Sequence, residues 1–455
     1  TSRYPARRFR HHTTLMNTPP SSGQFAFAKS RRFAPLFATQ FLGAFNDNLF
    51  KTALFVLISF YGLGQNSVLP ASQMLNLGAM LFILPYFLFS AISGQLSTKY
   101  DKAVLARIIK GMEVLIMALA AVGFWLQSVV LLLLCLFLMG MQSTLFGPLK
   151  YAILPDYLRE KELLAGNSLI ESGTFLAILF GQILGTIVAG APAGVVIALI
   201  MLVALLGQAS SLYMPRVAAK APNTRIDPHI VRSTFDLLRQ TRAQPPLWVA
   251  IIGISWFWFI GSVYTTQLPT FTRLHLGGNE NVFNLMLTLF SLGIGSGSII
   301  CAKLSHQRLH LGLIVPGTVG MSLFGLLLVW LTHGQHYSET AGIFAFLAQA
   351  NAWAVMLTIT LIGFCGGFFS VPLYTWLQTA SSDTFRAHAV AANNIVNGLF
   401  MVVAALLSAL LIWLFDSITL LYLIVAIGNI LILGYLWRYG TAVREDVLAF
   451  WRGRK

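Results

Sequence analysis

One stretch of the chain places acidic and basic side chains inside an apolar segment. Asp47 and Lys51 lie near the middle of residues 33–61, a segment longer than the roughly 20 apolar residues that cross a bilayer. An ionisable group at the bilayer centre costs about 2.5–3.5 kcal/mol, so it normally faces a protein interior or a water-filled cavity. The acid precedes the base by four residues, so the two share a helix face with Gln40 and can partly neutralise each other. We expect this polar stripe, with Asn46 and Asn48 flanking the acid, to face a central pathway.

A second acid, Glu171, lies about two turns inside the apolar segment 163–189 and has no base three or four residues away. Its partner must therefore come from another helix or from a substrate. Further amides, tyrosines and a lysine lie in other apolar segments, and together they would line one cavity. The predicted substrate-binding residues are Asp47, Lys51, Lys150, Asn167, Glu171, Tyr264, Gln267, Tyr374, Gln378, Asn393 and Asn397.

Structural roles for the same residues remain open alternatives. Asp47 and Lys51 could form a self-satisfied pair that only fixes one helix against its neighbour, and Glu171 could pack against Lys51 or Lys150. Lys150 could also be an ordinary cytoplasmic anchor. Tyrosines often serve packing, and Asn and Gln often join helices.

The composition excludes an ordinary soluble domain. Of the 455 residues 56% are hydrophobic and 10% are charged, whereas about 25% charged is usual. The three cysteines, Cys135, Cys301 and Cys365, lie in apolar segments, so we predict neither a disulfide framework nor a metal site. Motifs of soluble enzymes are absent from the sequence, so we predict no enzyme and no cofactor.

Glu113 is close to Lys110 and favours a local ion pair.

Apolar segments recur at membrane-spanning length, which predicts an all-α membrane protein with twelve spans. The apolar segment 345–378 is too long for one plain crossing, so we expect this segment to begin outside the bilayer. The predicted spans are 33–61, 72–96, 104–126, 128–150, 163–189, 192–214, 247–272, 281–302, 311–332, 345–378, 387–414 and 417–437.

The basic residues predict the orientation. With the N-terminus in the cytoplasm, 28 of the 30 Lys and Arg residues lie on the cytoplasmic side, and only Arg273 lies outside and Lys51 within the membrane. Both termini are therefore expected to be cytoplasmic. The net charge of +15 is then an orientation signal, with contact to anionic lipids, and excludes a nucleic-acid partner.

The chain divides at its longest cytoplasmic loop, in which residues 228–240 favour an amphipathic interfacial helix.

Met16 follows an Arg/His-rich run, and we expect it to be the native start, with residues 1–15 an extension. The expected domains are a disordered basic segment 1–32, a six-helix bundle 33–214, a linker 215–246, a second six-helix bundle 247–438 and a basic tail 439–455.

An internal repeat supports the division. Asn167 corresponds to Asn393 and Glu171 to Asn397 at an offset of 226 residues, and Pro-Leu precedes both sets. Chance similarity between apolar helices is the alternative, but the shared polar positions argue against it. Two six-helix halves related by a parallel repeat are typical of the major facilitator architecture, in which the binding site lies between the halves near mid-membrane.

Four stretches resemble the lysophospholipid transporter family of the major facilitator superfamily. They are Phe45–Leu54 (FNDNLFKTAL), Gly147–Pro155 (GPLKYAILP), Gly166–Gly181 (GNSLIESGTFLAILFG) and Gly366–Tyr374 (GGFFSVPLY). The resemblance covers about residues 33–440 and is closest to the transporter part of fusions with a glycerolipid acyltransferase and an acyl–acyl-carrier-protein ligase. This chain has no His-x4-Asp acyltransferase motif.

The resemblance implies that the chain moves lysophospholipids, chiefly lysophosphatidylethanolamine, from the outer to the inner leaflet of a bacterial inner membrane for reacylation. It implies that Asp47, Lys150 and Glu171 are functional and that such an acyltransferase or ligase is a partner. A zwitterionic headgroup requires both signs of charge, the acids for its ammonium and the lysines for its phosphate.

The sequence departs from the family at two places and from the general facilitator motif at a third. The segment 247–272 has no internal Arg, and Asn397 stands where an acid is expected, so Lys51 would supply the internal cation. Thr98 stands where the general facilitator motif has an Asp. Fold does not fix function, so a proton-coupled exporter or symporter of the same fold, with the unpaired Glu171 as proton carrier, is an alternative function. A non-transporting subunit that delivers lipid to an acyltransferase is another.

Overall fold

The computed structural model describes residues 23–67, 71–306 and 308–451. Met16 and the expected extension 1–15 lie outside this part. In it the chain forms an all-α protein, and the helices long and apolar enough to cross a membrane number twelve, as predicted. Six form an N-terminal half: α1 (Ala34–Phe60), α2 (Ala71–Lys99), α3 (Lys102–Trp125), α4 (Val129–Ala152), α6 (Glu160–Ala189) and α7 (Ala193–Leu212).

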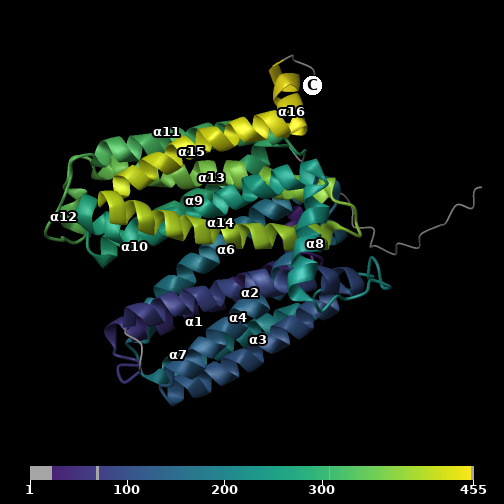
Figure 1. Cartoon of the computed structure of the whole chain (residues 1–455), viewed down its shortest axis with the longest axis horizontal. Coiled ribbons are helices and arrows are strands. Elements are labelled where there is room, and N and C mark those ends of the chain that lie inside the picture. Colours follow the sequence, from purple (N-terminus) through teal and green to yellow (C-terminus); the bar gives the residue numbers. More distant parts are fainter. Residues whose placement is uncertain (1–22, 68–70, 307, 452–455) are drawn as a thin grey trace, which may run out of the picture.

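The other six form a C-terminal half, and short helices connect the spans (Figure 1). The long spans are α9 (Pro245–Leu276), α10 (Glu280–Leu304), α11 (Ile314–Thr332), α13 (Ala352–Ala380), α14 (Arg386–Phe415) and α15 (Ile418–Tyr439). The short elements are η1 (Ala26–Lys29), α5 (Leu154–Tyr157), α8 (Ile230–Arg242), η2 (Leu311–Leu313), α12 (Ile343–Leu347) and α16 (Thr441–Trp451).

Polar side chains set where several spans begin. The Asp101 carboxylate accepts a hydrogen bond from the Ala103 amide at 2.8 Å, and Ser417 accepts one from Leu420 at 3.1 Å. Such caps satisfy amides that the first helical turn leaves unpaired. The predicted segment 345–378 is in fact two helices, α12 and α13, because the chain turns between them. The expected interfacial helix is α8, shifted by two residues.

Within each half the spans pack through small residues. A Cβ at Gly297 of α10 would lie 2.0 Å from the Phe364 carbonyl oxygen of α13, and one at Gly363 would lie 2.3 Å from the Phe290 carbonyl oxygen. Only glycine permits these backbones to approach so closely, as in other membrane bundles. The two helices are thereby held as one rigid pair.

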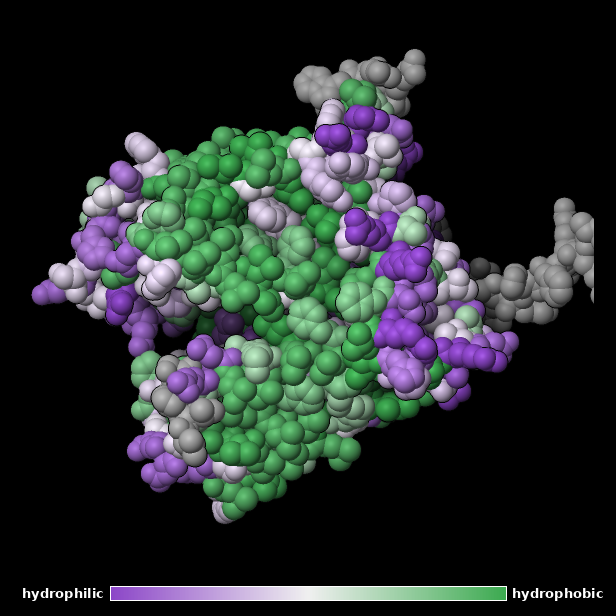
Figure 2. Space-filling view, viewed as in Figure 1, coloured by the Kyte–Doolittle hydropathy of each residue, from purple (hydrophilic) through white to green (hydrophobic). Residues whose placement is uncertain are grey.

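The two halves touch at one end of the molecule. There α6 packs against α10 and α13, and α2 and α4 pack against α14. Helix α8 runs across this end, and Figure 1 shows it nearly perpendicular to the spans. At the opposite end Figure 2 shows the surface hollowed between the halves. We refer to these as the α8 end and the open end.

The segment before α1 is folded from residue 23 onward. Phe27 and Phe33 are buried, Gln24 donates a hydrogen bond to the Ala302 carbonyl of α10, and Arg32 forms a bidentate ion pair with Glu162 of α6 at 2.7 and 2.8 Å. The expected disorder therefore does not extend to residues 23–32. This segment contacts both halves at the α8 end.

Candidate functional site

Asp47 is held in the N-terminal half by α4. Its Oδ2 accepts a hydrogen bond from the Ser143 hydroxyl, whereas its Oδ1 is buried and has no hydrogen-bond partner among the described residues. Lys51 interacts electrostatically with Asp47, but no ion pair joins these two side chains. The Lys51 ammonium instead lies 5.0 Å from the ring centroid of Phe82. The two residues are thus not a self-satisfied pair.

Glu171 faces the C-terminal half and is 3% exposed. The Ser370 hydroxyl of α13 donates to its Oε1, and its Oε2 is buried without a partner in the part of the chain that the structure describes. Lys150 interacts electrostatically with both Asp47 and Glu171. Its ammonium lies 5.0 Å from the ring centroid of Tyr151. One lysine therefore acts on two acids from two other helices, α1 and α6.

The predicted pair of Lys110 and Glu113 is confirmed, and it lies deep in the N-terminal half. Glu113 also accepts hydrogen bonds from Asn46 at 3.0 Å and from Gln142 at 3.2 Å, so both of its oxygens are occupied. A buried pair needs such additional partners to offset the loss of hydration. This network holds α1, α3 and α4 together.

The polar residues around Asp47 on α1 point in different directions. Asn46 points into the N-terminal half, Gln40 accepts a hydrogen bond from Thr174 of α6 at 3.0 Å, and Asn48 donates to the Ala44 carbonyl of its own helix at 2.8 Å. Successive helix positions point about 100° apart, so residues adjacent to Asp47 cannot share its direction. Asn46 and Asn48, which flank the acid, therefore point away from the direction of Asp47, and it stays a prediction that the stripe of Gln40, Asp47 and Lys51 faces a pathway.

A set of five residues joins the halves at the α8 end, and we call it the seam. Asn167 and Gln378 exchange two side-chain hydrogen bonds, of 2.6 and 3.1 Å. Asn167 also donates to Thr375 at 3.0 Å, and Gln378 donates to the Tyr151 carbonyl at 3.0 Å. The rings of Tyr151 and Tyr374 stack with centroids 4.5 Å apart. Asn167 and Gln378, predicted as substrate ligands, thus contact each other across the halves, and Tyr374, also a predicted ligand, contacts Tyr151 across them.

Neutral polar groups of the C-terminal half lie beside the seam. The Trp258 indole donates to the Tyr374 hydroxyl at 2.8 Å, and Ser255 donates to Asn397 at 2.8 Å. Asn393 is 1% exposed and approaches Tyr374, but neither of its amide atoms has a hydrogen-bond partner among the described residues. A buried amide without a hydrogen-bond partner is uncommon in proteins.

Two predicted ligands lie away from these groups. The Tyr264 ring is buried inside the C-terminal half, with its centroid 4.6 Å from that of Tyr422 and 6.0 Å from that of Phe290. Its side chain leaves α9 toward α10 and α15, so it serves packing. Gln267 is half-buried, and no hydrogen bond joins it to another residue in the described ranges.

The two halves differ in charge. The charges deep within the spans belong to the N-terminal half and are Asp47, Lys51, Lys110, Glu113 and Glu171, and Lys150 lies in the last turn of α4. In the C-terminal half the charged residues of the spans lie near helix ends: Arg273, Glu280, Lys303, Arg386 and Arg438. One half therefore presents charge, and the other presents amides, hydroxyls and aromatic rings.

The prediction missed Ser143, Ser370 and Trp258. A signal existed for two of them. Ser370 precedes Tyr374 and Gln378 by four and eight residues, and Ser143 precedes Lys150 by seven, so each lies on the same helix face as a predicted residue. The role of Trp258 depends on how α9 meets α13, which periodicity does not encode.

Two helical halves with a polar site between them define a multi-pass membrane transporter. The family model described as Major Facilitator Superfamily matches residues 36–344. The chain belongs to this superfamily.

Relatives named lysophospholipid transporter LplT confirm the resemblance in sequence. The protein from Cronobacter sakazakii is 26% identical over 375 residues, covering 80% of this chain and 85% of the relative. That from Escherichia coli O157:H7 (strain EC4115 / EHEC) is 27% identical over 384 residues with the same coverage.

Solved structures share the fold at low sequence identity. The human organic anion transporter MFSD10 has a TM-score of 0.69 at 15% identity and covers 88% of this chain and 99% of its own. A bacterial homologue of the iron transporter ferroportin, in an outward-facing state, has a TM-score of 0.60 at 15% identity, with coverage of 88% and 99%.

Proposed function

We propose that this protein moves lysophospholipids, chiefly lysophosphatidylethanolamine, from the outer to the inner leaflet of a bacterial inner membrane for reacylation. The observation that carries the proposal is that Asp47 of α1 and Glu171 of α6 each keep a buried carboxylate oxygen without a hydrogen-bond partner among the described residues, while Lys150 of α4 interacts electrostatically with both acids. The names of the relatives support the substrate class.

A zwitterionic headgroup fits both signs of charge in this group. The unpaired oxygens of Asp47 and Glu171 can accept hydrogen bonds from its ammonium. The ammonium groups of Lys51 and Lys150, which lie over aromatic rings and in no ion pair among the described residues, can bind its phosphate. Charge-assisted hydrogen bonds are about twice as strong as neutral ones. They can therefore replace the water that the headgroup loses.

The single acyl chain needs only an apolar environment. The interior of the C-terminal half offers aromatic and aliphatic side chains with no interior charge in its described spans. We place the headgroup against the N-terminal half and the chain toward the C-terminal half or the lipid. Burial of a methylene contributes about 0.8 kcal/mol, so the chain need not be held by polar contacts.

Transport then requires alternating access between the halves. The seam separates Glu171 from the α8 end, because Asn167 lies one helical turn nearer that end on α6. With the α8 end in the cytoplasm, as the basic residues favour, this conformation accepts substrate from the periplasmic side. Opening the seam would release it beside an acyltransferase or ligase, the proposed partner.

The test is uptake of labelled lysophosphatidylethanolamine by liposomes that contain the purified protein. Asp47→Asn should lower the rate at least tenfold, because the isosteric amide keeps the packing but loses the charge. Asp416→Asn is the matched control, since Asp416 is exposed at the end of α14. Equal rates for native protein and Asp47→Asn would contradict the proposal.

An uncoupler distinguishes the proton-coupled alternative. The proposal needs no ion gradient, so uptake should persist when protonophore is added. Uptake that stops with protonophore would assign Glu171 the role of proton carrier instead. Retention of an acyltransferase without uptake by the isolated chain would favour the lipid-delivering subunit.

A further inference from the structure

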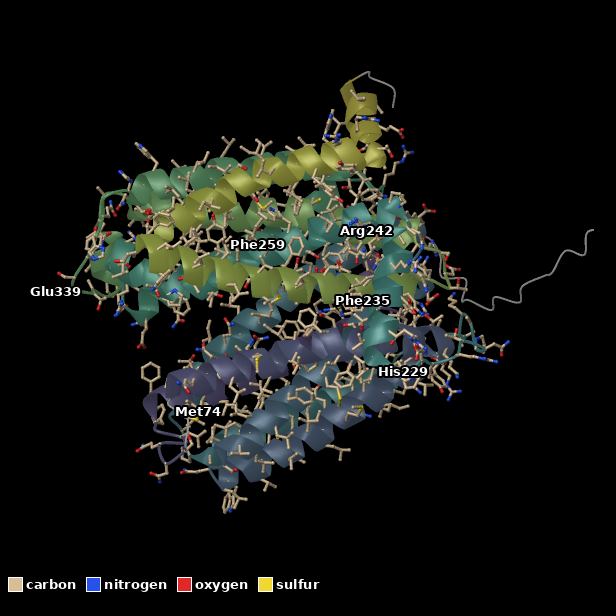
Figure 3. All side chains as sticks on the ribbon, viewed as in Figure 1. Met74, His229, Phe235, Arg242, Phe259 and Glu339 are labelled. Atoms are coloured by element: carbon tan, nitrogen blue, oxygen red, sulfur yellow. The ribbon has the colours of Figure 1, made fainter. Side chains whose placement is uncertain are left out.

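Helix α8 has an outer face that the site does not use. Val231 and Phe235 are 69% and 68% exposed and lie four residues apart, so they share one side of the helix. Arg239 and Arg242 are exposed on adjoining positions, and neither forms an ion pair among the described residues. Figure 3 labels Phe235 and Arg242 along this helix.

The opposite face of α8 is docked on both halves. Ser233, Leu237 and Thr241 are buried, and α8 contacts α2 of the N-terminal half and α9 and α14 of the C-terminal half. The Thr234 hydroxyl donates to the Phe87 carbonyl of α2 at 3.4 Å. One helix therefore bridges the halves at the end where they touch.

Helix α8 lies across one end of the spans and nearly perpendicular to them (Figure 1), as a helix at a membrane surface does. The chain just before α8 meets α2 at Gln95, four residues before Lys99, where α2 ends, which corresponds to about 6 Å along that helix. The Gln95 side chain of α2 accepts a hydrogen bond from the Asp227 amide at 2.8 Å, just before α8. Interfacial helices lie in this way, with apolar residues about 5–10 Å into the headgroup region and basic residues toward lipid phosphates.

We propose that the outer face of α8 binds an anionic phospholipid surface and that this contact stabilises the conformation in which the halves touch at the α8 end. Charge complementarity identifies the partner: the linker 215–246 carries six basic and two acidic residues. The hydrogen bond from Arg232 at 3.0 Å lowers the pKa of the Asp227 carboxyl, so that pair is internally satisfied. Arg239 and Arg242 remain for lipid phosphates.

Coupling to the halves follows from the two faces of one helix. When the halves separate, α8 must lose its contacts with α2 or those with α9 and α14, so the position of its outer face changes relative to one half. A surface that binds the docked arrangement better than the separated one shifts the equilibrium toward it. One arginine near an anionic surface changes the ratio of docked to separated protein about fivefold, and two arginines change that ratio about 25-fold.

The experiment measures the distance between the halves in the full chain. Spin labels are placed at Lys161 and Ser382, exposed positions of the two halves at the α8 end, after replacement of the native cysteines. The protein is compared in nanodiscs of phosphatidylcholine with and without phosphatidylglycerol. We expect phosphatidylglycerol to raise the population with the short distance, and Arg239→Gln with Arg242→Gln to lower that response about 25-fold. Phe235→Ser should also weaken it.

Arg273→Gln is the matched control, because Arg273 is exposed at the open end. It should respond to phosphatidylglycerol as the native protein does. A response that is absent in the native protein, or unchanged in the double variant, would overturn the proposal. A distance in phosphatidylcholine alone that differs between the double variant and the native protein would also overturn the proposal, since the arginines would then have a structural role. No transported substrate is needed, so the result is independent of the proposed function.

Discussion

Gln378 is the residue at which a seam role and a ligand role give opposite results. Gln378→Leu removes three hydrogen bonds between the halves, two with Asn167 and one with the Tyr151 carbonyl. Each contributes about 0.5–1.5 kcal/mol net, so the loss is about 3 kcal/mol when the halves touch. The same groups reach water when the halves separate, so that state loses little. The equilibrium should shift about 100-fold toward separation at the α8 end.

Distance measurement between labels at Lys161 and Ser382 checks this shift directly. The native protein should show mainly the short distance, and Gln378→Leu should populate a longer one. Gln349→Leu is the control, because Gln349 donates to the Leu276 carbonyl within the C-terminal half at 3.1 Å and does not bridge the halves. An unchanged distance distribution with weakened lysophospholipid binding would refute the seam and restore Gln378 as a ligand.

Three further predictions concern stability and packing. Lys110→Met leaves Glu113 buried without its cation and should lower the free energy of unfolding by about 3–5 kcal/mol, measured by thermal denaturation in detergent. Lys110→Met with Glu113→Gln should recover part of the lost stability. Full stability of the single variant would contradict the pairing. Gly297→Ala should destabilise by at least about 1–3 kcal/mol in the same assay, whereas Gly434→Ala, with open space around its Cβ, should not. Tyr264→Phe should leave liposome uptake unchanged, since its ring only packs within the C-terminal half; a large loss would return Tyr264 to the site.

The architecture was predictable because a bilayer imposes it. Twelve apolar segments of spanning length and an amphipathic linker are properties of local sequence, and both are present in the structure. The pair of Lys110 and Glu113 was predictable for the same reason, since three residues place side chains on one helix face.

The partners of the site residues were not predictable, because they depend on how helices meet. Spacing placed Asp47 beside Lys51, but the acid bonds Ser143 of another helix. The internal repeat aligned Glu171 with Asn397, yet the first faces Ser370 across the halves and the second bonds Ser255 within its own half. The repeat shows where polar groups lie along a helix and leaves their direction around its axis to tertiary packing.

Headgroup selectivity tests the central claim most directly, which is that unpaired acids of the N-terminal half bind the ammonium of a zwitterionic lipid. The measurement is the affinity of purified protein for lysophosphatidylethanolamine relative to lysophosphatidylglycerol, which lacks the ammonium. We predict that the native protein prefers the former about 10- to 100-fold, as hydrogen bonds to a charged group contribute about 1.5–3 kcal/mol. Asp47→Asn with Glu171→Gln should abolish the preference, and Glu280→Gln, at an exposed position, should preserve it. An undiminished preference in the double variant would contradict the claim.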